Sequence, residues 1–135
     1  MCIRDSGETV KLINNAVAAA NAAALAEALL VGQASGVDLD ALVKVMGEGS
    51  GGSAMLELKA GPMRAHDYTT LFKLEHMLKD VRLCLEEAQS ANVPFAAAAR
   101  ARDVLVAAMA RGHADDDFAA LLEALEAFAA TRLDG

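Results

Sequence analysis

Apolar residues recur three and four positions apart along most of the chain, a spacing that is typical of amphipathic helices. No stretch alternates apolar and polar residues in the way of a strand. Glycine and proline separate the apolar stretches, at Gly36, Gly47, Gly61-Pro62, Pro94 and Gly112. The pattern therefore predicts an all-α fold of about six helices in a single bundle-like domain, at residues 8–33, 38–47, 53–60, 70–91, 94–112 and 115–128.

Residues at the ends of these helices predict how several of them begin or stop. Asp38 is expected to cap the second helix, and Pro94 to lie in the first turn of the fifth, where its missing N–H does no harm. Gly61-Pro62 is expected to end the third helix, because proline cannot donate the hydrogen bond that a helix interior requires. Three aspartates at 115–117 place negative charge at the start of the sixth helix, which favours its dipole.

The composition restricts the classes of function that the chain could serve. With 135 residues it is long enough to bury a core as one domain. Its net charge of -7 and its lack of a Lys/Arg cluster argue against nucleic acid as a partner. Cys2 and Cys84 have neither redox nor zinc spacing, which favours a reducing, cytoplasmic setting. The longest apolar stretch, 16–31, is rich in alanine and contains Asn21 and Glu27, so we expect a buried helix and no membrane span.

Two polar residues near the start of the chain are candidates for chemistry. Lys11 and Asn15 are four positions apart, so on a helix they lie on one face, roughly 6 Å apart along the axis. A lysine can exchange a proton with a carbonyl or hydroxyl group, and an asparagine amide can orient that group. The spacing alone also fits a solvated lysine followed by polar helix residues. Against this, the adjacent Asn14 and Asn15 are poor helix formers in an otherwise alanine-rich helix.

Other motifs have simpler interpretations. The string GEGSGG at 47–52 satisfies the Gly-x-Gly-x-x-Gly pattern of dinucleotide-binding turns, but no strand precedes it, so we expect a flexible loop. Cys84 lies among leucines with no base nearby, as expected for a packed thiol. His66, His76 and His113 are too scattered in the sequence to indicate a metal site, and none is predicted.

Longer strings resemble a known family. GETVKLINN at 7–15, followed by AEALL and GVD, is similar to the C-terminal domain of the β-hydroxyacid dehydrogenases, which include 3-hydroxyisobutyrate dehydrogenase and 2-hydroxy-3-oxopropionate reductase. The similarity continues through GPMRAHDYTTLFKLEHMLKDVRLCLEEA at 61–88 and GHADDDFAALLEALE at 112–126. It implies a helical domain with the fold of the 6-phosphogluconate dehydrogenase C-terminal domain.

The resemblance also implies a function and a role for particular residues. It implies an NAD- or NADP-dependent enzyme that interconverts a small β-hydroxy acid and its aldehyde or keto form, and that forms homo-oligomers. Lys11 matches the catalytic lysine, Asn15 the amide that positions substrate, and Lys79 the lysine that contacts the cofactor. Phe72 is expected to line the pocket. Asp80 could orient Lys79, although we favour a solvated helical carboxylate.

The first residues depart from the family. MCIRDS at 1–6 resembles the in-frame translation of a sequencing-library adapter, so we expect these six residues not to be native and the native chain to continue upstream of Gly7. The missing part would be a Rossmann domain that holds most of the cofactor, and the isolated chain is expected to be inactive. Two alternatives stay open: a divergent, imine-reductase-like member of the superfamily, and a non-catalytic helical module for dimerisation or interaction.

Overall fold

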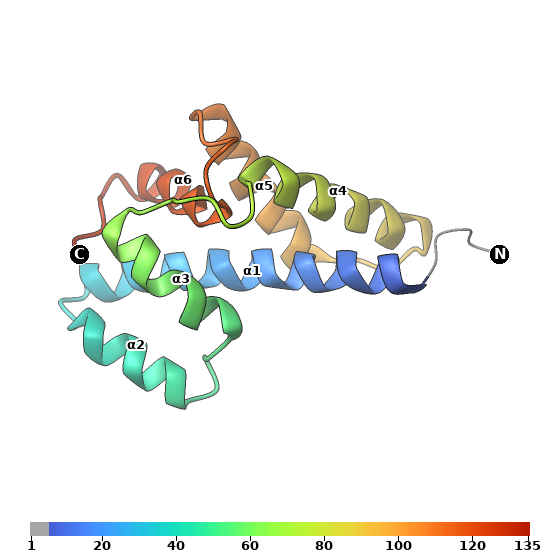
Figure 1. Cartoon of the computed structure of the whole chain (residues 1–135). Helices are drawn as coiled ribbons and strands as arrows, with labels where there is room; N and C mark the ends of the chain where they lie inside the picture. Colours follow the sequence, from blue (N-terminus) through green and yellow to red (C-terminus); the bar gives the residue numbers. More distant parts are fainter. Residues whose placement is uncertain (1–5) are drawn as a thin grey trace.

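The computed structural model describes residues 6–135, and these form six α-helices and one short 3₁₀ helix, with no strand among them (Figure 1). The predicted all-α class is therefore confirmed. Of the adapter-like segment 1–6, only Ser6 falls within the described residues, as the first residue of α1. The elements are α1 (Ser6–Ala34), α2 (Leu39–Glu48), α3 (Ala54–Ala65), α4 (Leu74–Ser90), α5 (Ala96–Ala110), η1 (Phe118–Ala120) and α6 (Leu121–Ala129).

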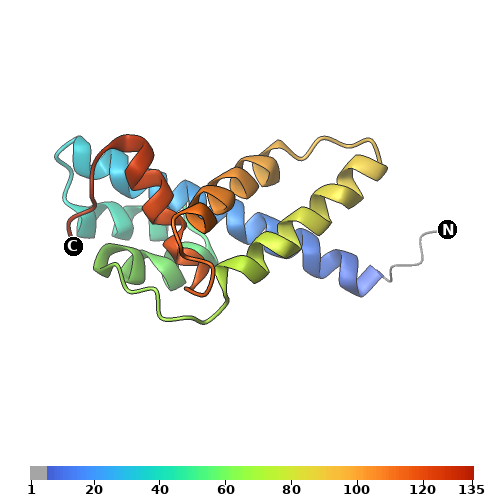
Figure 2. The ribbon, with the colours of Figure 1, turned by 90° about the horizontal axis from the view of Figure 1, so that it is seen from above.

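Helix α1 forms the axis of the domain and packs against all five other α-helices. Figure 2 shows α4 and α5 as an antiparallel pair that crosses α1, with their connecting loop near the start of α1 and the C-terminus near its other end. Alanines with no exposed surface line the packed side of α1, at Ala16, Ala19, Ala22 and Ala26. Because alanine favours helix and has a small side chain, this sequence gives a long helix that neighbours can approach closely.

Helix α2 packs closely on a glycine of α1. A Cβ atom at Gly32 would lie 2.6 Å from Leu42 Cδ2, so a larger residue there would displace the Leu42 side chain. Asp38 caps α2 as predicted, since its side chain accepts the Asp40 N–H at 2.9 Å. The predicted stop at Gly47 is wrong, because α2 continues through Glu48.

By length and composition, α1 could cross a membrane, in contrast to the prediction from the sequence. Half of its most apolar stretch is buried inside the domain, against the other helices. The core helix of a globular domain has the same length and composition. We therefore interpret α1 as a core helix.

The third helix passes through Gly61-Pro62, so the predicted end near Ala60 is wrong. Pro62 lies in the last turns of α3, where it removes a single helical hydrogen bond. One turn of additional helix buries Met63 completely, and His66 and Asp67 donate backbone N–H groups to Met63 and Pro62 to close the helix end. The burial of Met63 offsets the bond that proline cannot make.

The fourth helix begins at Leu74 and not at Thr70 as predicted. The Asp117 carboxylate accepts the N–H groups of Leu71 and Phe72 at 3.1 and 3.0 Å, which holds these residues outside the helix. Leu71, which falls within the predicted range of this helix, is exposed as a result. A long-range contact has thus overridden the local helical pattern.

The last two helices also differ from the predicted pattern. Pro94 precedes α5, which starts two residues later at Ala96, and Gly112 follows its end with φ +92°. Asp117 caps η1 by accepting the Ala119 N–H, so the aspartates do mark the start of a helix. Phe128 on α6 is mostly exposed, although it is aromatic.

Candidate functional site

A hydrogen bond joins the two longest helices at one of the candidate residues. Asn15 Nδ2 on α1 donates to Asp80 Oδ2 on α4 at 2.8 Å, and both side chains are half-buried. The interpretation of Asp80 as a solvated carboxylate is therefore wrong. This bond accounts for a poor helix former in α1, because the amide fixes α1 against α4. The Asn15 side-chain oxygen Oδ1 accepts no side-chain hydrogen bond within residues 6–135, so it is placed to accept one from a ligand.

The two candidate lysines lie close to this hydrogen bond along their helices. Lys11 precedes Asn15 by one turn of α1, roughly 6 Å along the axis, and Lys79 is the residue before Asp80 in α4. Both side chains are exposed, and neither has an ion-pair partner among residues 6–135. Lys11, Asn15 and Lys79 therefore start from neighbouring positions on α1 and α4, and their roles stay predictions.

The fourth candidate, Phe72, lies farther from this group of polar residues. It is half-buried in the stretch before α4, with its ring edge-to-face against Phe118 at a centroid distance of 6.0 Å. About 9 Å of helix separates the start of α4 at Leu74 from Asp80. Phe72 makes no hydrogen bond or ring contact with Lys11, Asn15 or Lys79 within residues 6–135. Its place in the wall of a cleft beside them stays a prediction.

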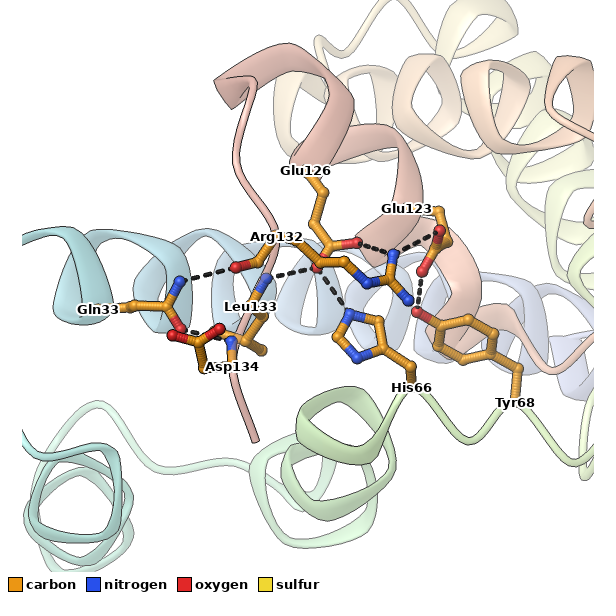
Figure 3. A network of polar contacts seen from close by, with 8 residues as sticks. All are labelled: Gln33, His66, Tyr68, Glu123, Glu126, Arg132, Leu133 and Asp134. Carbon is orange, nitrogen blue, oxygen red and sulfur yellow. Dashed lines mark hydrogen bonds and ion pairs between the residues drawn. The ribbon is translucent and has the colours of Figure 1, made fainter.

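A second polar cluster, formed by α6, the end of α3 and the C-terminal segment, was not predicted (Figure 3). His66, Glu123 and Glu126 offer ligand atoms that all lie within 4.8 Å of one another, which is close enough for one metal ion. Each of these three side chains already has a partner within the chain. Arg132 pairs with both glutamates at 3.4 Å, and His66 Nε2 lies 2.7 Å from Glu126. We therefore interpret the cluster as a set of contacts that holds the C-terminal segment, residues 130–135, against the rest of the domain.

Other contacts of the C-terminal segment support this interpretation. Glu126 accepts the Leu133 N–H at 2.7 Å, and Gln33 at the end of α1 donates to the Arg132 carbonyl and accepts the Asp134 N–H. Leu133 is buried against the core. Figure 3 shows these contacts as one continuous network that reaches from α6 to α1.

Tyr68 contributes a titratable group to this network. Its hydroxyl donates to Glu123 at 2.5 Å. Burial, followed by this hydrogen bond and the charge of Glu123, raises the pKa of Tyr68 well above its ordinary value. Burial alone would raise the pKa of Glu123, but the hydrogen bond from Tyr68 and the charge of Arg132 lower it below its ordinary value.

We expect the raised pKa of Tyr68 to make the domain less stable in alkali. The unfolded phenol ionises near pH 10 and the folded one at higher pH, so the stabilisation is present below about pH 10 and is lost above it. Tyr68→Phe should remove this part of the pH dependence and cost about 1 kcal/mol at pH 8 for the lost hydrogen bond. Urea unfolding of both proteins from pH 8 to 11 measures this, and parallel curves would contradict the account.

The glycine-rich string does not form a nucleotide-binding turn. Gly47 belongs to α2, and residues 49–53 connect α2 to α3 with no strand before them. At Gly52 a Cβ atom would lie 2.9 Å from the Met46 carbonyl oxygen, so the tight path of this loop requires glycine. The interpretation of this string as a loop is confirmed for residues 49–53.

Two residues that hold the candidate region in place could not be found from spacing. The sequence indicates Asp80 only as the neighbour of Lys79, because its hydrogen-bond partner Asn15 is 65 positions away. Asp117 was noted for its charge at a helix start, whereas it also binds the backbone before α4. The run of three aspartates before an apolar helix was the one available signal for Asp117.

Comparisons with known proteins define the class of domain. The fold is that of the helical domain of hydroxyacid dehydrogenases: a crystal structure of 3-hydroxyisobutyrate dehydrogenase from Salmonella typhimurium superposes with a TM-score of 0.79 at 28% identity, over 85% of this chain and 40% of that one. Residues 5–125 match the family described as "NAD-binding of NADP-dependent 3-hydroxyisobutyrate dehydrogenase". The chain belongs to this family, a branch of the β-hydroxyacid dehydrogenases.

Curated relatives are considerably longer than this chain. It is 36% identical over 122 residues to glyoxylate/succinic semialdehyde reductase 2, chloroplastic, of Arabidopsis thaliana, covering 90% of this chain and 34% of the relative. It is 33% identical over 118 residues to L-threonate dehydrogenase of Cupriavidus necator, covering 87% and 40%. The chain thus spans between a third and half of the length of these relatives.

Proposed function

We propose that this chain is the helical domain of an NAD(P)-dependent β-hydroxyacid dehydrogenase and that it closes over a cleft shared with a nucleotide-binding domain. The enzyme would interconvert a small β-hydroxy acid and its aldehyde or keto form. The Asn15–Asp80 hydrogen bond is the observation that carries the proposal, because it fixes α1 against α4 where Lys11 and Lys79 are both exposed. The family match and the names of the relatives support the class of reaction.

Each polar side chain has a distinct role in this proposal. The Lys11 ammonium donates a proton to the substrate oxygen as a carbonyl becomes an alcohol, and in the reverse direction the amine accepts that proton. The Asn15 amide, held by Asp80, orients the substrate through its side-chain oxygen Oδ1. Phe72 closes the side of the cleft next to α4.

The residues of α4 fit a nicotinamide cofactor. NAD(P)H, when bound, supplies the hydride. Lys79 is an exposed cation without an ion-pair partner within residues 6–135, on a chain whose net charge is -7. Such a lysine is suited to contact an anionic or polar part of the cofactor from the side opposite to the nucleotide-binding domain.

A non-catalytic dimerisation module is the second candidate. It is favoured by an exposed apolar stripe on α1, formed by Val10, Ile13 and Val17. Homo-oligomerisation is compatible with both candidates and stays a prediction, which light scattering of the purified chain would test. Hydride transfer separates the two candidates, since a module without catalysis would show none.

The experiment is a chimera in which this chain, from Gly7 onward, replaces the matched region of the Arabidopsis reductase. We expect it to oxidise NADH or NADPH in the presence of small aldehyde-acids such as succinic semialdehyde. A cyclic imine in the same panel tests the imine-reductase alternative. A folded chimera that binds cofactor but reduces no aldehyde-acid would contradict the proposed function.

A further inference from the structure

A buried ion pair lies beneath the stretch that carries Phe72. Lys59 Nζ on α3 contacts Asp117 Oδ2 at 2.8 Å, and both side chains are almost completely buried. The Lys59 ammonium also lies 4.6 Å from the centre of the Phe118 ring. Two opposite charges that are buried together must each be satisfied, because an unpaired charge in the interior is costly.

The second oxygen of Asp117 holds the backbone at Phe72. Asp117 Oδ1 accepts the backbone N–H groups of Leu71 and Phe72. Oδ2 accepts from the Lys59 ammonium and from the backbone N–H of Ala119. The Phe72 carbonyl accepts the Phe118 N–H at 3.0 Å, and its ring packs on the Phe118 ring. Phe72 is therefore fixed through its amide, its carbonyl and its ring by Asp117 and Phe118, the two residues that Lys59 contacts.

Stability alone gives little reason for a charged pair at this place. Buried ion pairs often stabilise a fold no more than well-packed apolar residues would. An apolar residue at position 117, however, could not accept two amides from an irregular stretch of backbone. Burial would raise the pKa of Asp117, but Lys59 and the backbone donors lower it, so the carboxylate that accepts these amides stays ionised.

We propose that Lys59 and Asp117 are positioning residues that fix Phe72 as a wall of the substrate cleft. The inference rests on the proposed function, and it adds two residues that do not touch substrate themselves. Lys59 contacts Asp117 and Phe118 and makes no hydrogen bond to Phe72 within residues 6–135, so any effect of Lys59 on the cleft must pass through Asp117 and Phe118.

The test variant is Lys59→Met, which keeps the length of the side chain and removes the charge. Asp117 then loses its cation, and we expect amide hydrogen exchange at Leu71 and Phe72 to accelerate about tenfold or more in this chain alone. Lys59→Arg retains a cation and should restore much of the protection. If Lys59→Met does not fold, Lys59→Met with Asp117→Asn removes both charges and should show the same acceleration. Unchanged exchange at Phe72 would overturn the proposal, regardless of the activity that the chimera shows.

The functional arm uses the chimera. Lys59→Met should raise KM for the aldehyde-acid about tenfold with little change in kcat, because the cleft wall moves while the proton donor does not. Phe72→Leu should raise KM similarly, and the two changes together should be no worse than Phe72→Leu alone. Effects that multiply would show that Lys59 acts on general stability and would overturn the positioning role. A chimera with no turnover before any substitution would instead contradict the proposed function and, with it, the cleft wall.

Discussion

Lys11→Ala in the chimera should lower kcat about a hundredfold to ten-thousandfold, the range that general acid–base groups contribute. In the proposed mechanism the lysine ammonium supplies the proton that neutralises the developing alkoxide, and alanine has no group to replace it. The Kd for NADPH should change little, because Lys79 and the nucleotide-binding domain make the cofactor contacts in this account. Steady-state kinetics and a fluorescence titration of NADPH measure the two quantities.

The matched control for this substitution is Lys44→Ala. Lys44 is an exposed lysine of α2, outside the candidate site, so its loss should leave kcat within about twofold. If both variants kept full turnover, the role of Lys11 as proton donor would be wrong. The family assignment would stand, since it depends on the match of residues 5–125 and not on this residue.

Leu29→Ala should lower the free energy of unfolding of this chain by about 2 to 5 kcal/mol, the cost of a cavity in a rigid core. Leu29 has no exposed surface and lies on the face of α1 that packs against the other helices. Because alanine is an excellent helix former, the loss would reflect packing and not helix propensity. Urea unfolding followed by circular dichroism measures the change.

Val31→Ala on the same helix is the control for Leu29. Val31 is 64% exposed, so its truncation should change the free energy of unfolding by less than about 0.5 kcal/mol. Equal effects of the two substitutions would mean that α1 is not the buried axis of the domain. Such a result would also reopen the question of what covers this long apolar helix.

The helices were predictable from the sequence where local pattern and packing agree, and their ends were not. The cap at Asp38 is a contact between residues two positions apart, so the sequence shows it directly. The start of α4 is set by Asp117, more than forty positions away, and the path of α3 through Pro62 is set by the burial of Met63. Neither contact leaves a periodic signal.

In the candidate site, too, the features set by local spacing were predictable and the long-range contacts were not. The pairing of Lys11 with Asn15 follows from helical spacing, and the resemblance to the β-hydroxyacid dehydrogenases adds Lys79 and Phe72. The bond between Asn15 and Asp80 needs the packing of α1 against α4, which no spacing within either helix contains. The cluster of His66, Glu123 and Glu126 was invisible for the same reason, because it joins α6 to the end of α3.

A crystal structure of the chimera with NADPH and a non-reducible carboxylate analogue of the substrate would show whether Lys11 and Asn15 bind the substrate together. We expect Lys11 Nζ within about 3.2 Å of the ligand oxygen that replaces the carbonyl, with the Asn15 amide on the same ligand and Lys79 on the cofactor. A ligand bound elsewhere, with Lys11 and Asn15 turned to solvent, would contradict this expectation.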